Sequence, residues 1–337
     1  ILLKMHSMKS LLYIANVRLP TEKAHGLQIM KTCEALANKN AQVKLAVPRR
    51  LNHLKDDPFD FYNVSHNFSV EKLGCLDFIS LPFFKKFTFW LESFTFFLAV
   101  KKILKNNNFD AYYTRDLIFA LWLSKSFKKV FYEIHSLPEF PDEKYKTAWN
   151  NSAGLVVISE GIKTDLIKYG VDEKKIILVR DAAELDKFKI AESKDESRDK
   201  LSLPKNKNII LYTGHLYKWK GADFVAKVAE KMPEAEVYLV GGTRADITDF
   251  KNKYKFKNLH VVGWQEHKKI PYWLNAVDVL VLPNSGVEKI SSHYTSPMKL
   301  FEYMAAKKSI VASDLPSLRE VLGSESAVFV RSDDVDA

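Results

Sequence analysis

The amino-acid sequence predicts an α/β protein built from two doubly wound, Rossmann-like parallel-sheet halves. Short aliphatic runs alternate with amphipathic helical patterns along the whole chain, as in successive βαβ units. The strand signal stops between Asp181 and Lys207, where charged residues, Ser and Pro dominate, and then begins again. A chain of 337 residues with 47% hydrophobic content is long enough for two cores. We therefore expect an N-terminal domain over residues 9–183 and a C-terminal domain over 184–337.

Aliphatic and aromatic runs mark the expected strands of each half. In the first half they are Leu11–Ala15, Val43–Val47, Ala111–Tyr113, Val130–Ile134, Leu155–Ile158 and Ile176–Val179. In the second half they are Asn208–Tyr212, Glu236–Val240, Leu259–Val262, Val279–Leu282 and Ser309–Ala312. A helix is expected over Gly26–Asn38, because Ile29, Cys33 and Leu36 recur at helical spacing. Functional residues of such sheets lie in the loops that follow the strands.

Charge and cysteine usage limit the partners and the compartment. The formal net charge of +10 is spread along the chain, which favours anionic partners such as a phosphorylated substrate, an acidic membrane face or nucleic acid. The two cysteines, Cys33 and Cys75, form neither a metal-ligand spacing nor a disulfide framework. A reducing, cytoplasmic location is therefore expected.

The segment 83–105 combines aromatic and basic residues. Lysines and one glutamate interrupt every apolar window, so the segment is not expected to span a bilayer. Two interpretations stay open: peripheral binding to an anionic membrane, on the inner face, or the core of a helical hairpin. The residues concerned are Phe83, Phe84, Phe87, Phe89, Trp90, Phe94 and Phe97, with Lys85, Lys86, Lys101, Lys102 and Lys105.

The loop after the first strand of the second half is a candidate phosphate site. It runs from Gly214 to Gly221 and carries Lys220 just before a predicted helix. A glycine at a strand end lets the backbone approach a ligand, and a lysine beside a helix N-terminus adds positive charge to unpaired N–H groups. An ordinary βα turn with a solvated lysine is the alternative.

A second candidate segment begins at Thr295. Ser296 is predicted as N-cap and Pro297 as the first helical residue, which would aim N–H groups at an anion. Lys299 and Glu302 share one helix face, where the lysine can reach phosphate and the carboxylate can accept hydroxyl hydrogen bonds. A solvated ion pair is the alternative. Since Leu300, Phe301 and Met304 mark the other side as core, a buried helix is expected.

Together these segments resemble the donor site of the family-four retaining glycosyltransferases with the GT-B fold. The Gly214–Gly221 loop is similar to the family's Gly-Arg-Leu-x-x-x-Lys-Gly stretch, with His215 where arginine is usual. The segment around Glu302 is similar to the family's E-x7-E motif, with Tyr294 in place of the first glutamate. The resemblance implies two Rossmann-like domains that face a central cleft, with the acceptor in the first and a nucleotide sugar in the second.

Further motifs in the family's order extend the resemblance to most of the chain, and it implies residue roles. His135, Lys220 and Glu302 would take part in catalysis, and Glu302 would accept hydrogen bonds from the donor's ribose. The acceptor side would be shaped by Ala24, His25 and Gly26. The donor would be bound by Gly214, His215, Lys220, Gly241, Gly242, Trp264, Gln265, Tyr294, Thr295, Ser296, Pro297, Lys299 and Glu302.

The expected reaction is transfer of a hexose-type sugar, with retention, from a nucleoside diphosphate sugar to a glycan, lipid-linked or small-molecule acceptor. No cofactor and no metal are expected, because lysines and helix N–H groups would stabilise the departing diphosphate. The family usually continues beyond the position of Ala337 with helices that cross back to the N-terminal domain, so either a shortened C-terminus or an unusually compact domain is expected. A GT-B epimerase or phosphorylase stays open as the alternative.

Two other classes of protein fit the sequence less well. The loop Asn16–Pro20 lacks the Gly-x-Gly-x-x-Gly pattern of dinucleotide oxidoreductases. No reader module for nucleic acid is present in the sequence, so a basic nucleic-acid-binding protein is disfavoured and no nucleic-acid partner is expected.

Overall fold

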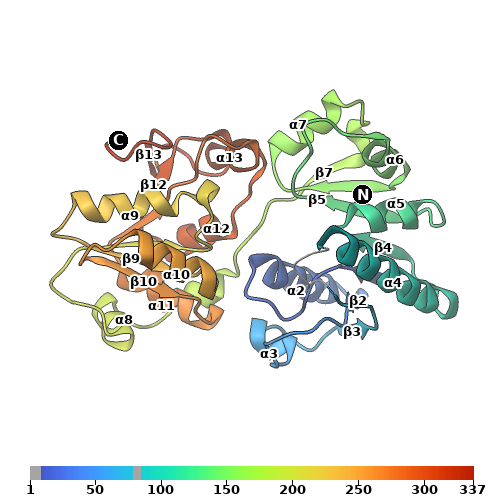
Figure 1. Ribbon diagram of the computed structural model, residues 1–337, viewed down its shortest axis with the longest axis horizontal. Helices are drawn as coiled ribbons and strands as arrows, with labels where there is room; N and C mark the ends of the chain where they lie inside the picture. Colours follow the sequence, from blue (N-terminus) through green and yellow to red (C-terminus); the bar gives the residue numbers. More distant parts are fainter. Residues whose placement is uncertain (1–8, 79–84) are drawn as a thin grey trace. The chain divides into compact units, whose positions relative to one another are not determined.

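The structure, a computed structural model, describes residues 9–78 and 85–337. The chain forms two compact units. One comprises the residues up to Val157 with Lys163–Leu178, and the other comprises Ile158–Ile162 with Val179–Ala337. Each unit contains one all-parallel sheet with helices packed against it (Figure 1). The predicted class, α/β with two doubly wound parallel sheets, is confirmed.

The first unit contains a seven-stranded sheet in the order β3-β2-β1-β4-β5-β6-β7. The strands are β1 (Ser10–Ile14), β2 (Gln42–Pro48), β3 (Ser69–Leu73), β4 (Ala111–Thr114), β5 (Val130–Ile134), β6 (Gly154–Val157) and β7 (Ile176–Leu178). The helices are α2 (Ala24–Ala37), α3 (Pro58–Tyr62), α4 (Lys85–Asn106), α5 (Leu117–Ser124), α6 (Glu143–Asn151) and, from Lys163 on, α7 (Glu160–Lys168). The direction of strand addition reverses between β1 and β4, which is where doubly wound sheets bind ligands.

Side chains of β1 alternate between the two faces of this sheet, as the pleat of a strand requires. Leu12 and Ile14 pack in one core with Phe96 of α4 and Phe119 of α5. Tyr13 points to the opposite side, close to Cys33 of α2. The sheet is therefore covered on both faces, which explains its nearly continuous apolar strands.

The second unit contains a six-stranded sheet in the order β10-β9-β8-β11-β12-β13, with its reversal between β8 and β11. The strands are β8 (Ile209–Thr213), β9 (Glu236–Val240), β10 (Leu259–Gly263), β11 (Val279–Leu282), β12 (Ser309–Ser313) and β13 (Val328–Val330). The helices are α8 (Lys194–Leu201), α9 (Ala222–Lys231), α10 (Arg244–Lys253), α11 (Ile270–Ala276), α12 (Met298–Ala306) and α13 (Pro316–Arg319). Ile209 and Leu211 of β8 face the core formed with α11 and α12, whereas Ile210 and Tyr212 face α9.

Two edge strands were not among the expected strands. The strand β3 is partly exposed and carries Glu71 and Lys72, and β13 is a three-residue strand at the other sheet's edge. Edge strands commonly carry charges because one side meets water, so the apolar pattern that identifies central strands is weak there.

The segment 181–207, where the strand signal stops, is packed into the second unit. Ser193 and Glu196 form a capping box that starts α8. Arg198 is 2% exposed, and its guanidinium donates to four backbone carbonyls and to the Asp278 carboxylate. The charge of this segment thus reflects one buried arginine network as well as solvated surface.

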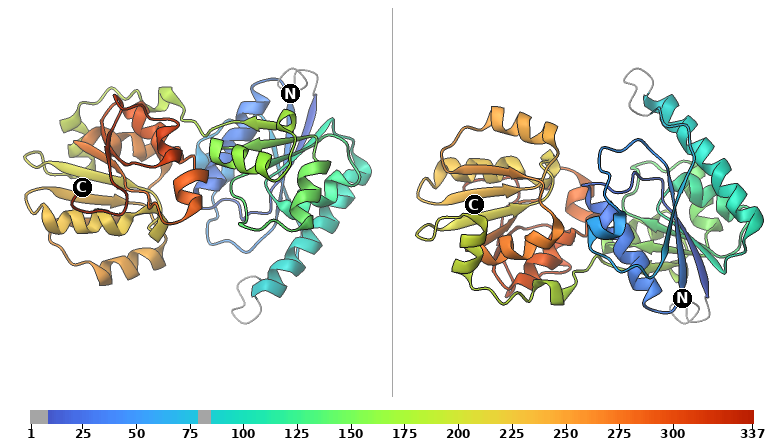
Figure 2. Two further views of the ribbon diagram at one scale, coloured as in Figure 1. Left: turned by 90° about the horizontal axis from the view of Figure 1, so that it is seen from above. Right: turned by 90° about the horizontal axis from the view of Figure 1, so that it is seen from below.

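The helix α4 bears on both interpretations of the segment 83–105, because it has a buried face and an exposed face. Phe96, Val100 and Ile103 are core residues, whereas Phe87, Trp90, Phe94 and Leu98 are exposed. Figure 2 shows the first turns of α4, in teal, extending past the rest of its unit. Phe83 and Phe84 lie outside the described residues, and within those that are described no helix is long and apolar enough to cross a bilayer.

Candidate functional site

Three glycines bring the ends of β8, β9 and β10 into contact at the carboxyl edge of the second sheet. Gly214 N donates to Val240 O at 2.8 Å, and Gly241 N donates to Gly263 O at 2.8 Å. A Cβ atom at Gly241 would lie 2.3 Å from Gly214 O, and Gly241 has a φ of +126°. Only glycine fits there, so the two predicted glycines hold adjacent loops at close range.

The loop from Gly214 to Gly221 is fixed against the end of β11. Gly221 has a φ of +78°, and a Cβ atom there would lie 1.6 Å from Pro283 O. The His215 side chain is buried and stacks on Tyr217 with ring centroids 5.0 Å apart. Since β8 and β11 flank the reversal of strand order, this loop lies where ligands of such sheets bind.

Lys220 is a poorly solvated cation in this loop. Its ammonium nitrogen lies 5.1 Å from the Trp219 ring centroid and 5.8 Å from that of Tyr217. Burial lowers the pKa of Lys220 from 10.5 to about 8, because the charged form loses water. By contrast, the neighbouring Lys218 is exposed.

The start of α12 differs from the prediction. The helix begins at Met298 with Pro297 as N-cap, and no side chain caps it. The Ser296 hydroxyl accepts a hydrogen bond from Asp181 N at 3.0 Å instead, so the assignment of Ser296 as N-cap and of Pro297 as first helical residue was wrong. This serine joins the chain segment after β7 to the start of α12.

The buried face of α12 also differs from the expected one. Leu300 and Tyr303 are fully buried, and the Tyr303 hydroxyl accepts from Thr213 N at 2.8 Å. Met304 is 40% exposed, so its assignment to the core side was wrong. Phe301 is partly buried and packs against the core. Lys299 lies on the buried side, because α12 packs this face against the end of β8.

Lys299 is the most unusual charged group of the second unit. It is 8% exposed, and its ammonium nitrogen lies 3.9 Å from the Tyr212 ring centroid. Within the described residues, this nitrogen has no hydrogen-bond partner. Burial, together with the nearby charge of Lys220, lowers the pKa of Lys299 well below its ordinary value, and Glu302 opposes the change. A buried cation without a partner is unfavourable, so the pair of lysines forms a site suited to an anion.

Glu302 is held by a residue that the sequence did not single out. His267 Nε2 lies 2.9 Å from the Glu302 carboxylate, whose side chain is 12% exposed. His267 follows Trp264 and Gln265 in the loop after β10, so these predicted donor-binding residues and Glu302 border one region of the second unit. The proximity of His267 to the Trp264 motif was the only signal available in the sequence.

Tyr294 is the last residue of a five-residue π-helix, Ile290–Tyr294, that precedes α12. Thr295 follows it directly. Tyr294 is 3% exposed, so the side chain at the position of the family's first glutamate is packed inside the unit. Ser291 of this turn donates to Trp219 O at 3.1 Å, which connects the turn to the Lys220 loop. Gly242, with a φ of +91°, packs against Leu216 on the same loop.

The remaining predicted residues belong to the first unit. Ala24, His25 and Gly26 form the first turn of α2, and a Cβ atom at Gly26 would lie 2.1 Å from the Tyr62 hydroxyl oxygen. His135 follows β5 directly, and its Nε2 lies 2.5 Å from the Glu133 carboxylate. The expected relation of these residues to the donor across a cleft stays a prediction.

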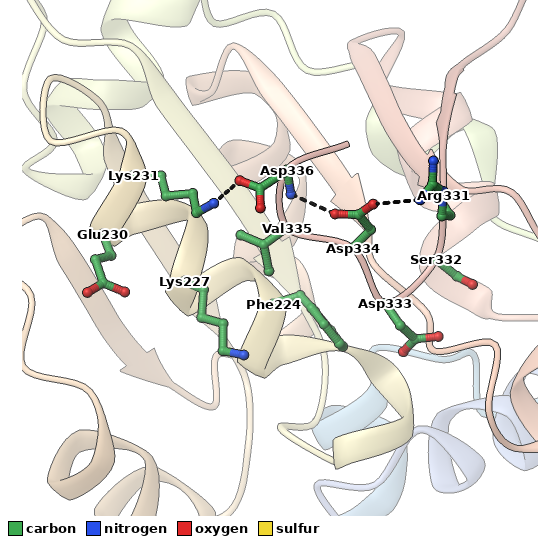
Figure 3. A pocket seen from close by; sticks show the side chains of 10 residues that line it. All are labelled: Phe224, Lys227, Glu230, Lys231, Arg331, Ser332, Asp333, Asp334, Val335 and Asp336. Carbon is green, nitrogen blue, oxygen red and sulfur yellow. Dashed lines mark hydrogen bonds and ion pairs between the residues drawn. The ribbon is translucent and has the colours of Figure 1, made fainter.

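One open cavity, of about 560 Å³, lies away from all predicted residues. It lies between α9 and the last residues of the chain, and Figure 3 shows Lys231 paired with Asp336 and Arg331 paired with Asp334. Because these charges satisfy one another, the cavity offers less to an anion than Lys299 does. Across residues 9–78 and 85–337, no three His, Cys, Asp or Glu side chains form a group that could hold a metal ion.

Comparisons with known proteins bear on both units. The family model Glycosyltransferase Family 4 matches residues 26–187, and the model Glycosyl transferases group 1 matches residues 207–337. The chain is 25% identical over 175 residues to the uncharacterized glycosyltransferase MJ1069 of Methanocaldococcus jannaschii, covering 50% of the chain and 42% of the relative. It is 26% identical over 210 residues to an uncharacterized 41.2 kDa protein in the cps region of Klebsiella pneumoniae, covering 56% and 57%. The match thus spans less than two thirds of either relative.

Solved structures show the same architecture. Sucrose-phosphate synthase from Thermosynechococcus elongatus has a TM-score of 0.77 at 18% identity, covering 97% of this chain and 87% of that one. Anabaena HepE in complex with UDP-glucose has a TM-score of 0.72 at 15% identity, covering 97% and 86%. The two family models divide the chain between them in the order that the motifs predicted. This chain therefore belongs to the family 4, group 1 glycosyltransferases and has their GT-B fold.

Proposed function

We propose that this chain is a retaining glycosyltransferase that moves a hexose-type sugar from a nucleoside diphosphate sugar to a glycan, lipid-linked or small-molecule acceptor. The observation that carries the proposal is the buried ammonium of Lys299, which has no hydrogen-bond partner among the described residues and lies near the charge of Lys220. A diphosphate would satisfy both cations at the strand ends where such sheets bind ligands. The UDP-glucose complex of HepE, a protein of the same fold, is consistent with this donor class.

The same cations would act during the reaction. As the bond to the sugar breaks, negative charge grows on the departing diphosphate, and fixed cations in a poorly solvated site stabilise that charge without reorganising. We therefore propose that transfer needs neither a metal ion nor a cofactor. Retention would follow from attack on the same face of the sugar, with the leaving phosphate accepting the proton of the acceptor hydroxyl.

Glu302 has a binding role in this proposal. Its carboxylate can accept hydrogen bonds from the donor's ribose hydroxyls, and His267, whose Nε2 lies 2.9 Å from it, would orient it. Trp264 is 37% exposed in the loop after β10, and we propose that it lies near the nucleotide base. These contacts would fix the donor while the two lysines stabilise its phosphates.

We also propose that the first unit binds an anionic membrane surface through α4. Four exposed apolar residues, Phe87, Trp90, Phe94 and Leu98, follow one another at spacings of three and four and so lie along one face of the helix. The Trp90 and Phe94 rings are stacked, with centroids 5.5 Å apart. Lys101 and Lys105, both exposed, continue the same face, which combines apolar anchors with charge for acidic headgroups.

Thermal unfolding in the presence of UDP, GDP and ADP, and of their sugar conjugates, tests the donor site. A bound nucleotide at about 100 times its Kd should stabilise the protein by roughly 2.7 kcal/mol. Lys299→Met should abolish this stabilisation, whereas the exposed Lys251→Met should not. Product analysis with and without acceptor then separates transfer from epimerisation or phosphorolysis. If no nucleotide of this class stabilises the protein, the donor site is wrongly assigned.

A further inference from the structure

Glu133 is a buried carboxylate that the proposed mechanism does not use. It lies in β5, one residue before the strand ends, and its side chain is 5% exposed. Its Oε1 lies 2.5 Å from His135 Nε2, and the Tyr13 hydroxyl donates to its Oε2 at 3.5 Å. Such a group is costly to bury, so its contacts call for an explanation.

The carboxylate of Glu133 is ionised. Burial by itself would raise its pKa, but the hydrogen bond and charge of His135, the charge of Arg115 and the Tyr113 hydroxyl hold the pKa at about 2. An ionised carboxylate can only accept hydrogen bonds. His135 must therefore carry a proton on Nε2, which fixes the orientation and the tautomer of its ring.

The imidazole of His135 is neutral near pH 7. Burial lowers the pKa of His135 below 6.5 and the charge of Arg115 lowers it further, while Glu133 acts in the opposite direction. A neutral ring with a proton on Nε2 has a lone pair on Nδ1. Nδ1 makes no hydrogen bond within the part of the chain that the structure describes. The side chain is 26% exposed, so a ligand can reach it.

The groups around Glu133 and His135 come from β1, α2, β4 and the loop after β4. Arg115 donates to Gln28 Oε1 at 2.7 Å, and its Nε lies 4.0 Å from Glu133 Oε1. The titratable and charged groups near the pair are Tyr13 of β1, Cys33 of α2, Tyr113 of β4, and Arg115 and Asp116 of the loop after β4.

We propose that Glu133 is a positioning residue, which fixes His135 with Nδ1 as a hydrogen-bond acceptor for a hydroxyl group of the sugar substrate. This assignment rests on the proposed glycosyltransferase function, because a sugar supplies the hydroxyl donor. A phosphate dianion has no proton to donate, so His135 would favour the sugar part of the substrate over the phosphate part.

The free protein gives the first test, by NMR of its imidazole nitrogens. The wild type should show His135 protonated on Nε2, with a titration midpoint below 6.5. Glu133→Gln should lower the midpoint, because the carboxylate that favours the imidazolium is gone. Arg115→Gln should raise it. Glu139→Gln, which changes an exposed carboxylate in the loop after His135, should leave it unchanged. A proton on Nδ1 in the wild type would overturn the proposal.

The second test is the pH dependence of kcat/KM with a nucleotide sugar and its acceptor. The acidic limb should follow the His135 midpoint in each variant. Glu133→Gln should reduce the plateau roughly 10- to 100-fold, the range found when the carboxylate partner of a metal-bound histidine is removed. If Glu133→Gln leaves both limb and plateau as in the wild type, Glu133 has no positioning role. If no nucleotide sugar is turned over, the proposed function fails instead, and the NMR titration still decides the Glu133–His135 pair.

Discussion

Lys220 offers the sharpest test of the donor site, because its removal should have opposite effects on stability and on activity. The fall of its pKa from 10.5 to about 8 corresponds to roughly 3 kcal/mol by which folding disfavours the charged form at pH 7. Lys220→Met keeps the methylene packing and removes the charge. We expect this variant to unfold at a higher temperature than the wild type in the absence of ligand, by a free energy of up to about 3 kcal/mol.

The pH dependence of this stability difference has a definite sign. Below pH 8 the lysine is charged in both the folded and the unfolded protein, so the penalty is present in full. Between pH 8 and 10.5 the folded protein releases the proton first, and the penalty declines. The advantage of Lys220→Met should therefore be largest at pH 7 and smaller at pH 9.5. Binding of a nucleoside diphosphate should take up a proton above pH 8, and its affinity should fall there.

The effect on turnover should be large. Loss of one preorganised electrostatic donor typically lowers kcat by a factor of about 100 to 1,000, or roughly 3–4 kcal/mol. Lys220→Ala should therefore fold and be nearly inactive, and Lys220→Arg should recover only part of the rate because a guanidinium presents its charge differently. The matched control is Lys218→Ala, which changes an exposed neighbour and should have little effect.

Initial rates at saturating donor, together with thermal unfolding of the same variants, decide the question. If Lys220→Ala keeps wild-type turnover, or if Lys218→Ala is the more damaging change, the diphosphate does not bind at this loop. A Lys220→Met protein less stable than the wild type at pH 7 would show that the cation is better solvated than its surroundings indicate.

Three further predictions concern the metal, Glu302 and α4. Transfer should survive EDTA, because lysines and helix N–H groups are assigned to the phosphates; loss of turnover on chelation, restored by Mg²⁺ or Mn²⁺, would contradict this. Glu302→Gln should raise the dissociation constant of the donor more than it lowers kcat, since an amide keeps one acceptor and loses the charge-assisted bonds. A covalent sugar adduct on Glu302 in mass spectra would refute the binding role. Trp90→Glu and Phe94→Glu should reduce co-flotation with anionic liposomes at low salt, whereas Phe140→Glu, at a residue 84% exposed outside α4, should not. Absence of wild-type flotation would disprove the membrane contact.

The central strands were predictable because both faces of each sheet are covered. In that setting the sequence must be apolar at successive positions, and the runs Val130–Ile134, Glu236–Val240 and Val279–Leu282 agree with β5, β9 and β11 to the residue. The edge strands β3 and β13 were missed, because half-exposed strands lose that signal. The family was indicated by the resemblance of its motifs, and the glycines of those motifs stand at strand ends where backbone contacts leave room for no other residue.

Details that depend on which atoms meet across long sequence separations were not predictable. Ser296 was expected to cap α12, but it binds the backbone of Asp181, 115 residues earlier. Arg198 lies in a segment that reads as a polar connection, yet its guanidinium binds the Ala276 carbonyl and the Asp278 carboxylate, 78 and 80 residues later. Local patterns describe only neighbours in sequence, and a polar side chain takes whichever distant partner the packing presents.

The sequence by itself determined the fold class, because the alternation of apolar runs and helical patterns is a local consequence of a parallel sheet. Its resemblance to a known family indicated that family and most of the residues at the strand ends. Only the tertiary structure decided the electrostatic state of those residues. Among the described residues Lys299 has no hydrogen-bond partner, because α12 places it against Tyr212. His135 contacts a carboxylate that its own hydrogen bond and Arg115 keep ionised despite burial. The charge and the tautomer of a side chain depend on desolvation and on neighbours brought together by folding, and neither quantity is encoded at a single position of the chain.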